Sequence, residues 1–212
     1  MSDVSRSDTR PEFATLARAL VARLHDHGLG TRARLVVGVA GESGSGKSVT
    51  AANLARELCD DGHPALVLHQ DDYFLLPPRA NHAARERDIG RVGPGEVNLA
   101  LLQSHASAFR AGHSVVDSPT VDYAADRFDV RHLELQKVEV LVIEGTYVLQ
   151  LPDLDVRIFL EATYSATLAR RRARGRDVDS PFVERVLAIE HELIAPQAAL
   201  ADLIVDPDFA VR

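Results

Sequence analysis

The chain reads Gly41-Glu42-Ser43-Gly44-Ser45-Gly46-Lys47-Ser48 at one junction, and this stretch decides how its surroundings fold. It fits the phosphate-binding pattern G-x-x-x-x-G-K-[ST]. The preceding residues, 35–40, are apolar and rich in β-branched side chains, as in a buried parallel strand. Apolar residues recur at helical spacing over 49–58. The sequence therefore predicts a strand, a phosphate-binding loop and a helix in that order.

Each residue type in this loop has a physical role. The glycines permit positive φ angles and remove side chains, so backbone N–H groups can point at an anion. The following helix adds unsatisfied amides and the positive end of its dipole. Lys47 supplies a mobile charge for the β- and γ-phosphates, and Ser48 supplies a hydroxyl for Mg²⁺. A glycine-serine turn with an incidental lysine is the alternative, and the flanking strand and helix argue against it.

Predicted strands and helices alternate along the chain. Helices are expected at 13–24, 97–109, 165–174 and 181–193, and further strands at 65–69, 138–143, 156–160 and 203–205. The β-α-β pattern over 35–69 predicts parallel pairing with a right-handed crossover. The polar stretch 77–95 is expected to be a mobile connection outside the core. We therefore predict one domain, 1–212, with an N-terminal helix within 1–33 and a doubly wound α/β fold around a mainly parallel sheet.

Composition narrows the class of protein. A chain of 212 residues can bury a full core. A net charge of −7 argues against a nucleic-acid binder, because such proteins usually present a basic face to phosphates. Cys59 is the single cysteine, no secretory leader is evident, and no apolar run approaches the ~20 residues of a membrane span. We expect a cytoplasmic protein with a small-molecule partner, no nucleic acid and no membrane, and homo-oligomerisation stays open.

Two acidic residues follow predicted strands. Asp71 follows 65–69 after one residue, Gln70, and Glu144 closes the run 138–143. Ligands of open α/β sheets bind at the carboxyl ends of the strands, so both carboxylates are expected near the phosphate loop. Asp71 is the candidate base for an acceptor hydroxyl, and Glu144 joins Ser48 as a candidate Mg²⁺ ligand. A capping aspartate and a solvated glutamate are the alternatives, which the neighbouring phosphate loop disfavours.

A cluster of arginines ends the predicted helix 165–174 and continues beyond it: Arg170, Arg171, Arg172, Arg174 and Arg176. Helical residues diverge by about 100° per position, so Arg170 or Arg171 can share a face with Arg174. A mobile lid over 170–180 would place cations on phosphate and exclude water. Stabilisation of the helix carboxyl end by cations is equally compatible with this pattern.

The order of these motifs resembles the uridine kinase and phosphoribulokinase family over most of the chain after residue 34. The resemblance is carried by 41–48, His69-Gln70-Asp71-Asp72-Tyr73-Phe74, Val142-Ile143-Glu144-Gly145, Leu168-Ala169-Arg170-Arg171, Arg174-Gly175-Arg176-Asp177 and Ala201-Asp202-Leu203-Ile204-Val205. It implies ATP as the phosphoryl donor, Mg²⁺ at Ser48 and Glu144, Asp71 as the base, and a lid that uses Arg171 and Arg174.

The acceptor side departs from the family pattern. Uridine kinases carry an aspartate where this chain has Gly95, and Glu96 follows one position later. Val121 stands where the family has an aromatic residue, which leaves Tyr123 as the stacking candidate. The acceptor therefore stays open between a nucleoside and another small alcohol such as pantothenate, glycerate or a sugar phosphate. A regulatory nucleotide-binding module is a third possibility, which the absence of a guanine-reading N-K-x-D segment and the base-like Asp71 disfavour.

The complete set of predicted site residues follows from these arguments. The catalytic residues are Asp71, Lys47, Arg171 and Arg174. The nucleotide-binding residues are Gly41, Glu42, Ser43, Gly44, Ser45, Gly46, Lys47, Ser48, Val49 and Arg170. The acceptor-binding residues are Asp71, Tyr73, Glu96, Tyr123 and Arg176, and the metal ligands are Ser48 and Glu144.

Overall fold

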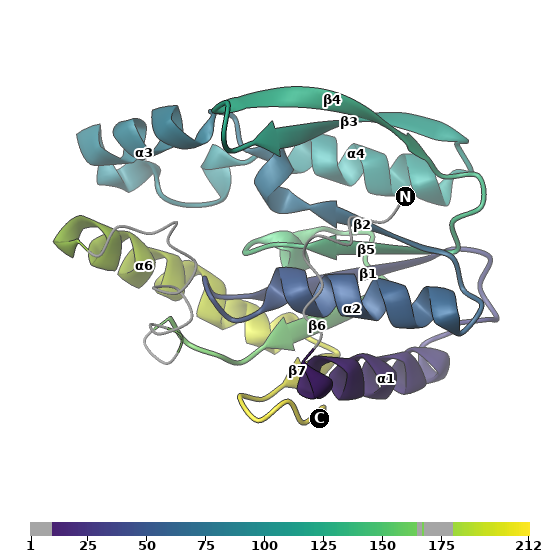
Figure 1. Ribbon diagram of the computed structural model, residues 1–212. Coiled ribbons are helices and arrows are strands. Elements are labelled where there is room, and N and C mark those ends of the chain that lie inside the picture. The colour runs from purple at the N-terminus through teal and green to yellow at the C-terminus, as the bar shows by residue number, and fades with distance from the viewer. Residues whose placement is uncertain (1–9, 165–166, 168–179) are drawn as a thin grey trace.

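A parallel sheet of five strands forms the centre of the computed structural model, which describes residues 10–164, 167 and 180–212 (Figure 1). Its strand order is β2-β5-β1-β6-β7. The bounds are β1 Leu35–Gly41, β2 Ala65–His69, β5 Val140–Glu144, β6 Val156–Leu160 and β7 Leu203–Val205. All five strands lie where the sequence predicts them, and the α/β fold class is confirmed.

Helices cover both faces of this sheet. Their bounds are α1 Pro11–Asp26, α2 Lys47–Asp60, α3 Pro78–Arg87, α4 Leu99–Arg110 and α6 Pro181–Ile194. Side chains of β1 alternate between the faces: Leu35, Val37 and Val39 pack with α1 and α2. Val36 and Ala40 pack with α4 on the other face. Because both faces are buried, the strand is a continuous apolar run instead of an alternating one.

Two sequence expectations need correction, and one pair of strands was not predicted. Strands β1 and β2 run parallel, but both pair with β5, so the expected direct pairing between them is wrong. The sequence predicts that residues 77–95 are a mobile connection outside the core, yet they contain α3 and bury Asn81, Ala84 and Val92. An antiparallel hairpin, β3 Val115–Asp122 and β4 Arg127–Glu134, was not predicted. It lies on the α4 side of the sheet (Figure 1).

The carboxyl ends of the strands and the amino end of α2 meet at one edge of the sheet. Strand β1 leads into the loop before α2, β2 leads into the short 3-10 helix Gln70–Tyr73, and β5 ends at Glu144. Helices α3 and α6 approach the same edge (Figure 1). The predicted catalytic residues of the described part are therefore gathered there. No helix within 10–164 and 180–212 is long and apolar enough to cross a membrane, and the cytoplasmic location stays a prediction.

Candidate active site

The loop between β1 and α2 has the backbone that a phosphate site requires. Gly46 occupies the N-cap of α2 with a φ of 100°, in the left-handed region, and no side chain caps the helix. The first amides of α2 therefore keep no side-chain partner, and the helix dipole favours an anion there. Lys47 Nζ donates to the carbonyl of Glu42 at 3.1 Å, which folds the lysine over its own loop.

A cavity of about 420 Å³ lies against this loop. Its lining residues are Ser43, Gly44, Lys47, Ser48, Val49, Asp71, Phe74, Asn81, Arg85, Glu144, Thr146 and Glu190. Within the described residues, the buried hydroxyl of Ser45 has no hydrogen-bond partner, which fits a loop built to surround an anion. The loop and cavity thus fit the phosphates of a nucleotide. We call this space the donor cavity.

The donor cavity also contains the oxygen ligands that Mg²⁺ prefers. Ser48 and Glu144 both line it, one from the first turn of α2 and the other from the end of β5. The Glu144 side chain is 3% exposed, and its Oε1 lies 2.7 Å from Nδ1 of His69 on the neighbouring strand β2. A hydroxyl and a carboxylate are hard ligands that suit Mg²⁺ bound partly through phosphate oxygens. His69 fixes the orientation of the carboxylate.

The loop side chain of Glu42 does not line the donor cavity. Its Oε1 lies 2.7 Å from Nδ1 of His191, and its Oε2 accepts a hydrogen bond from the backbone N–H of Tyr164 at 2.6 Å. Thr167 Oγ1 donates to the carbonyl of Ser43 at 3.0 Å. The carboxylate of Glu42 therefore fastens the phosphate loop to α6 and to the segment after β6, while its backbone stays part of the loop.

Asp71 and Asp72 have different surroundings although they are neighbours. Asp71 lines the donor cavity and a second cavity beside it, and Tyr123 donates its hydroxyl to Asp71 Oδ2 at 3.1 Å. Asp72 is buried; its Oδ1 accepts from the backbone N–H of Val121 at 2.9 Å, and Arg131 lies 3.6 Å from its Oδ2. Asp71 is thus the carboxylate that faces both cavities, and Asp72 ties the β3–β4 hairpin to the sheet.

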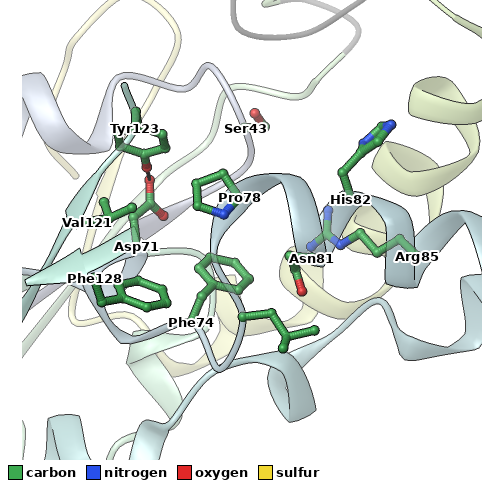
Figure 2. Close-up of a pocket in the computed structure, with 11 residues that line it drawn as sticks. Ser43, Asp71, Phe74, Pro78, Asn81, His82, Arg85, Val121, Tyr123 and Phe128 are labelled. Carbon is green, nitrogen blue, oxygen red and sulfur yellow. Dashed lines mark hydrogen bonds between the residues drawn. The ribbon is translucent and has the colours of Figure 1, made fainter. Parts of the chain in front are cut away.

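The second cavity, which we call the acceptor cavity, has a volume of about 510 Å³. Its lining residues are Ser43, Asp71, Phe74, Leu76, Pro78, Asn81, His82, Arg85, Val121, Tyr123 and Phe128. In Figure 2, Val121, Tyr123 and Phe128 of the hairpin lie on one side, and Asn81, His82 and Arg85 of α3 lie on the other. Asp71 and Phe74 lie between them. The hairpin and α3, both unexpected from the sequence, therefore form its walls.

Tyr73 and Glu96, two of the predicted acceptor contacts, do not line this cavity. Tyr73 is 1% exposed, and its hydroxyl lies 2.8 Å from His105 Nδ1 and 3.1 Å from Ser118 Oγ in the core. Burial raises the pKa of Tyr73 to about 12. Phe74, one position later, lines the cavity instead. The Glu96 carboxylate is 1% exposed and binds Arg85. Tyr73 and Glu96 thus make contacts inside the protein, and neither lines the acceptor cavity as the sequence predicted.

Arg85 is a site residue that the sequence did not reveal. Its Nε and Nη2 donate to Glu96 Oε1 and Oε2 at 2.7 and 2.8 Å, and Nη2 also donates to Glu190 Oε1 at 3.1 Å. Burial lowers the pKa of Arg85, but the Glu96 hydrogen bonds and the Glu190 charge outweigh it and raise the pKa overall. Burial raises the pKa of Glu190, while Arg85 and Lys47 act to lower it. Arg85 therefore links α3 to α6 while lining both cavities.

The arginines of the predicted lid lie outside the described residues. Arg170, Arg171, Arg174 and Arg176 fall within 168–179, so their contact with nucleotide or acceptor stays a prediction. Of the predicted nucleotide-binding residues, Ser43, Gly44, Lys47, Ser48 and Val49 line the donor cavity, and their contact with nucleotide stays a prediction.

Comparison with known proteins identifies the family. Residues 36–208 match the model of the Phosphoribulokinase / Uridine kinase family. The chain belongs to this family. Kinases of this family use ATP with Mg²⁺ and phosphorylate hydroxyl groups, so the chain is an ATP-dependent kinase with an alcohol group as acceptor. ATP and Mg²⁺ are the cofactors that the donor cavity fits.

Individual relatives differ in the acceptor that their names state. A uridine kinase from Listeria monocytogenes is 31% identical over 192 residues, covering 82% of this chain and 88% of its own. A bifunctional alpha-galactosidase/sucrose kinase from Mediterraneibacter gnavus is 28% identical over 192 residues. That match covers 84% of this chain but 20% of the larger protein.

Solved structures share the fold at lower identity. A phosphoribulokinase from Rhodobacter spheroides has a TM-score of 0.59 at 16% identity, covering 82% of this chain and 70% of its own. A D-glycerate 3-kinase from Cryptococcus neoformans has a TM-score of 0.56 at 12% identity, covering 93% of this chain and 95% of its own. Membership of the family establishes ATP as the phosphoryl donor and a hydroxyl group as the acceptor. The acceptor molecule differs among these relatives, so the lining of the acceptor cavity is the evidence that bears on it.

Proposed function

We propose that this kinase transfers the γ-phosphoryl group of ATP to a hydroxyl of a nucleoside. The observation that supports this acceptor is the wall of the acceptor cavity. Phe74, Tyr123 and Phe128 give it aromatic surface, and Asn81 gives it amide hydrogen-bonding groups on the α3 side (Figure 2). A cavity of about 510 Å³ is within the range of small-molecule sites, ~300–1,000 Å³. Aromatic surface suits a planar base, and amide groups suit sugar hydroxyls.

In this proposal Asp71 is the general base. It lies where the donor and acceptor cavities meet, so an acceptor hydroxyl beside it would face the transferring phosphate. Tyr123 occupies Oδ2 of Asp71, which leaves Oδ1 to accept the hydroxyl proton. Lys47 and the amides of α2 bind phosphate oxygens, with Ser48 and Glu144 as the Mg²⁺ ligands. Mg²⁺, when bound, neutralises charge on the phosphates.

The charges around the acceptor cavity favour a neutral acceptor. Among its described lining residues, Arg85 carries the permanent positive charge, and Glu96 and Glu190 already neutralise it. Asp71, another lining residue, adds a negative charge. An acceptor with its own phosphate or carboxylate would meet this negative excess without a free cation from the described walls. Nucleosides are therefore expected to be better acceptors than glycerate or a sugar phosphate.

An acceptor panel tests this proposal. The protein is mixed with ATP and Mg²⁺, and ADP release is followed with nucleosides, pantothenate, glycerate and sugar phosphates. A nucleoside is expected to give the highest acceptor-dependent kcat/KM. Faster turnover with glycerate or a sugar phosphate would replace the nucleoside by the second candidate, a small-alcohol kinase. Tight ATP binding without acceptor-dependent ADP from any compound would instead indicate a regulatory nucleotide-binding module.

A paired substitution tests the aromatic wall itself. Phe128→Ala is expected to raise the KM for the nucleoside and to leave the KM for ATP unchanged, because Phe128 lines the acceptor cavity and not the donor cavity. Val130→Ala, on the same strand but 69% exposed, is the matched control and should change neither constant. Equal effects of the two substitutions on the nucleoside KM would contradict the stacking role.

A further inference from the structure

Two histidines and an aspartate converge at the edge of the sheet opposite the cavities. His25 belongs to the last turn of α1, Asp61 caps the carboxyl end of α2, and His63 lies in the connection to β2. One potential ligand atom from each lies within 4.8 Å of those of the other two. Two chain segments, the last turn of α1 and the stretch 61–63 that follows α2, thus bring nitrogen and oxygen donors to one surface point.

The spacing of these donors suits a tetrahedral metal ion. Zn²⁺ binds histidine nitrogen and carboxylate oxygen at about 2.0–2.2 Å, which places two ligands of a tetrahedron about 3.3–3.6 Å apart. His25 Nε2 lies 3.4 Å from Asp61 Oδ2, already at that separation. The rings of His25 and His63 meet edge to face, with centroids 5.9 Å apart and an angle of 66° between their planes. A side-chain adjustment of His63 by about an ångström brings its ligand nitrogen to the same separation from the other two ligand atoms. The fourth position of the tetrahedron is then left for water.

Glu139 provides the outer contact that metal-binding histidines usually have. Its Oε2 lies 2.9 Å from Nδ1 of His63, which leaves Nε2 as the nitrogen free to bind a metal. The backbone there is fixed, because Glu139 N–H donates to the carbonyl of Pro64 at 2.8 Å and His63 N–H donates to Leu58 at 2.8 Å. The His63 side chain is 18% exposed, against 47% for His25. The backbone of His63 is thus fixed, while its ring, which Glu139 contacts, can make the small adjustment that the metal requires.

We infer that His25, Asp61 and His63 bind one Zn²⁺ ion, with Glu139 orienting His63. The ion connects α1 to the carboxyl end of α2 and to the connection before β2, at the amino ends of the strands. This site is separate from the donor cavity and independent of the proposed acceptor. Mixed imidazole and carboxylate ligands favour zinc over Mg²⁺, which binds oxygen.

Calorimetric titration of metal-free protein with Zn²⁺ tests this inference, with excess Mg²⁺ and a non-hydrolysable ATP analogue occupying the donor cavity. The wild-type protein is expected to bind one equivalent that His25→Ala abolishes. Glu139→Gln should weaken binding about 10–100-fold, as loss of an outer contact does in other zinc sites. The control is His132→Ala, which removes an exposed histidine paired with Asp117 and should bind zinc like the wild type.

Thermal unfolding supplies a second readout. Free Zn²⁺ at one hundred times its Kd is expected to raise the Tm of the wild type by about 5–10 °C and that of His25→Ala by much less. Zinc binding of equal stoichiometry and affinity in wild type and His25→Ala would overturn the inference. So would an absence of zinc binding by the wild type.

Discussion

The buried ion pair between Arg85 and Glu96 gives the sharpest prediction about stability. Arg85→Met keeps an apolar stem of similar length but removes the guanidinium, which leaves the 1%-exposed Glu96 carboxylate without its bidentate partner. Glu190 loses its hydrogen bond as well. Removing one partner of a buried pair costs about 3–5 kcal/mol. Since 1 kcal/mol shifts the Tm of a chain of this size by about 2–4 °C, we expect a fall of about 6–20 °C.

Equilibrium unfolding in urea measures this cost directly. The matched control is Arg87→Met on the same helix, where the side chain is exposed and a change within about 0.5 kcal/mol is expected. The double variant Arg85→Met/Glu96→Gln should recover part of the loss, because no uncompensated carboxylate remains at 96. Equal unfolding free energies for Arg85→Met and Arg87→Met would refute the reasoning.

Three further predictions concern other contacts. Gly145→Ala places a Cβ 2.3 Å from Gln70 Cβ, so unfolding measurements should show a loss of about 1–3 kcal/mol. Burial lowers the pKa of His105, so the wild type loses stability as pH falls below about 6.5, where the unfolded chain takes up the proton first. His105→Asn should flatten that dependence in unfolding curves between pH 7 and 5. Ser48→Ala should raise the Mg²⁺ concentration for half-maximal ADP formation about 10–100-fold.

The sequence predicted the sheet well because its central strands, β1 and β5, are buried on both faces and its other strands are mostly apolar. The bounds 65–69 and 156–160 agree with β2 and β6, which are mostly apolar apart from His69 and Arg157. The hairpin was missed because β3 contains Pro119 and both strands expose charged side chains. The alternation Arg127-Phe128-Asp129-Val130-Arg131 was the available signal for β4.

The site was predictable where it depends on local sequence and strand ends. Asp71, Ser48 and Glu144 line the donor cavity as expected, because parallel strands bring their carboxyl ends to one edge. Arg85 was not predictable, because its partners lie 11 and 105 residues away. Tyr73 was expected to contact the acceptor, but the 3-10 turn after β2 directs it into the core, and Phe74, for which no role was predicted, lines the cavity. Spacing along the chain gives no cue to that turn.

The central claim is that Asp71 joins a donor site and an acceptor site in one kinase. Single-turnover transfer from ATP to the best acceptor of the panel, measured beside ATP affinity for wild type and Asp71→Asn, tests it most directly. Asp71→Asn is expected to slow transfer about 10²–10⁴-fold, the usual contribution of a general base, with an unchanged Kd for ATP. Transfer within a few-fold of the wild-type rate would contradict the account.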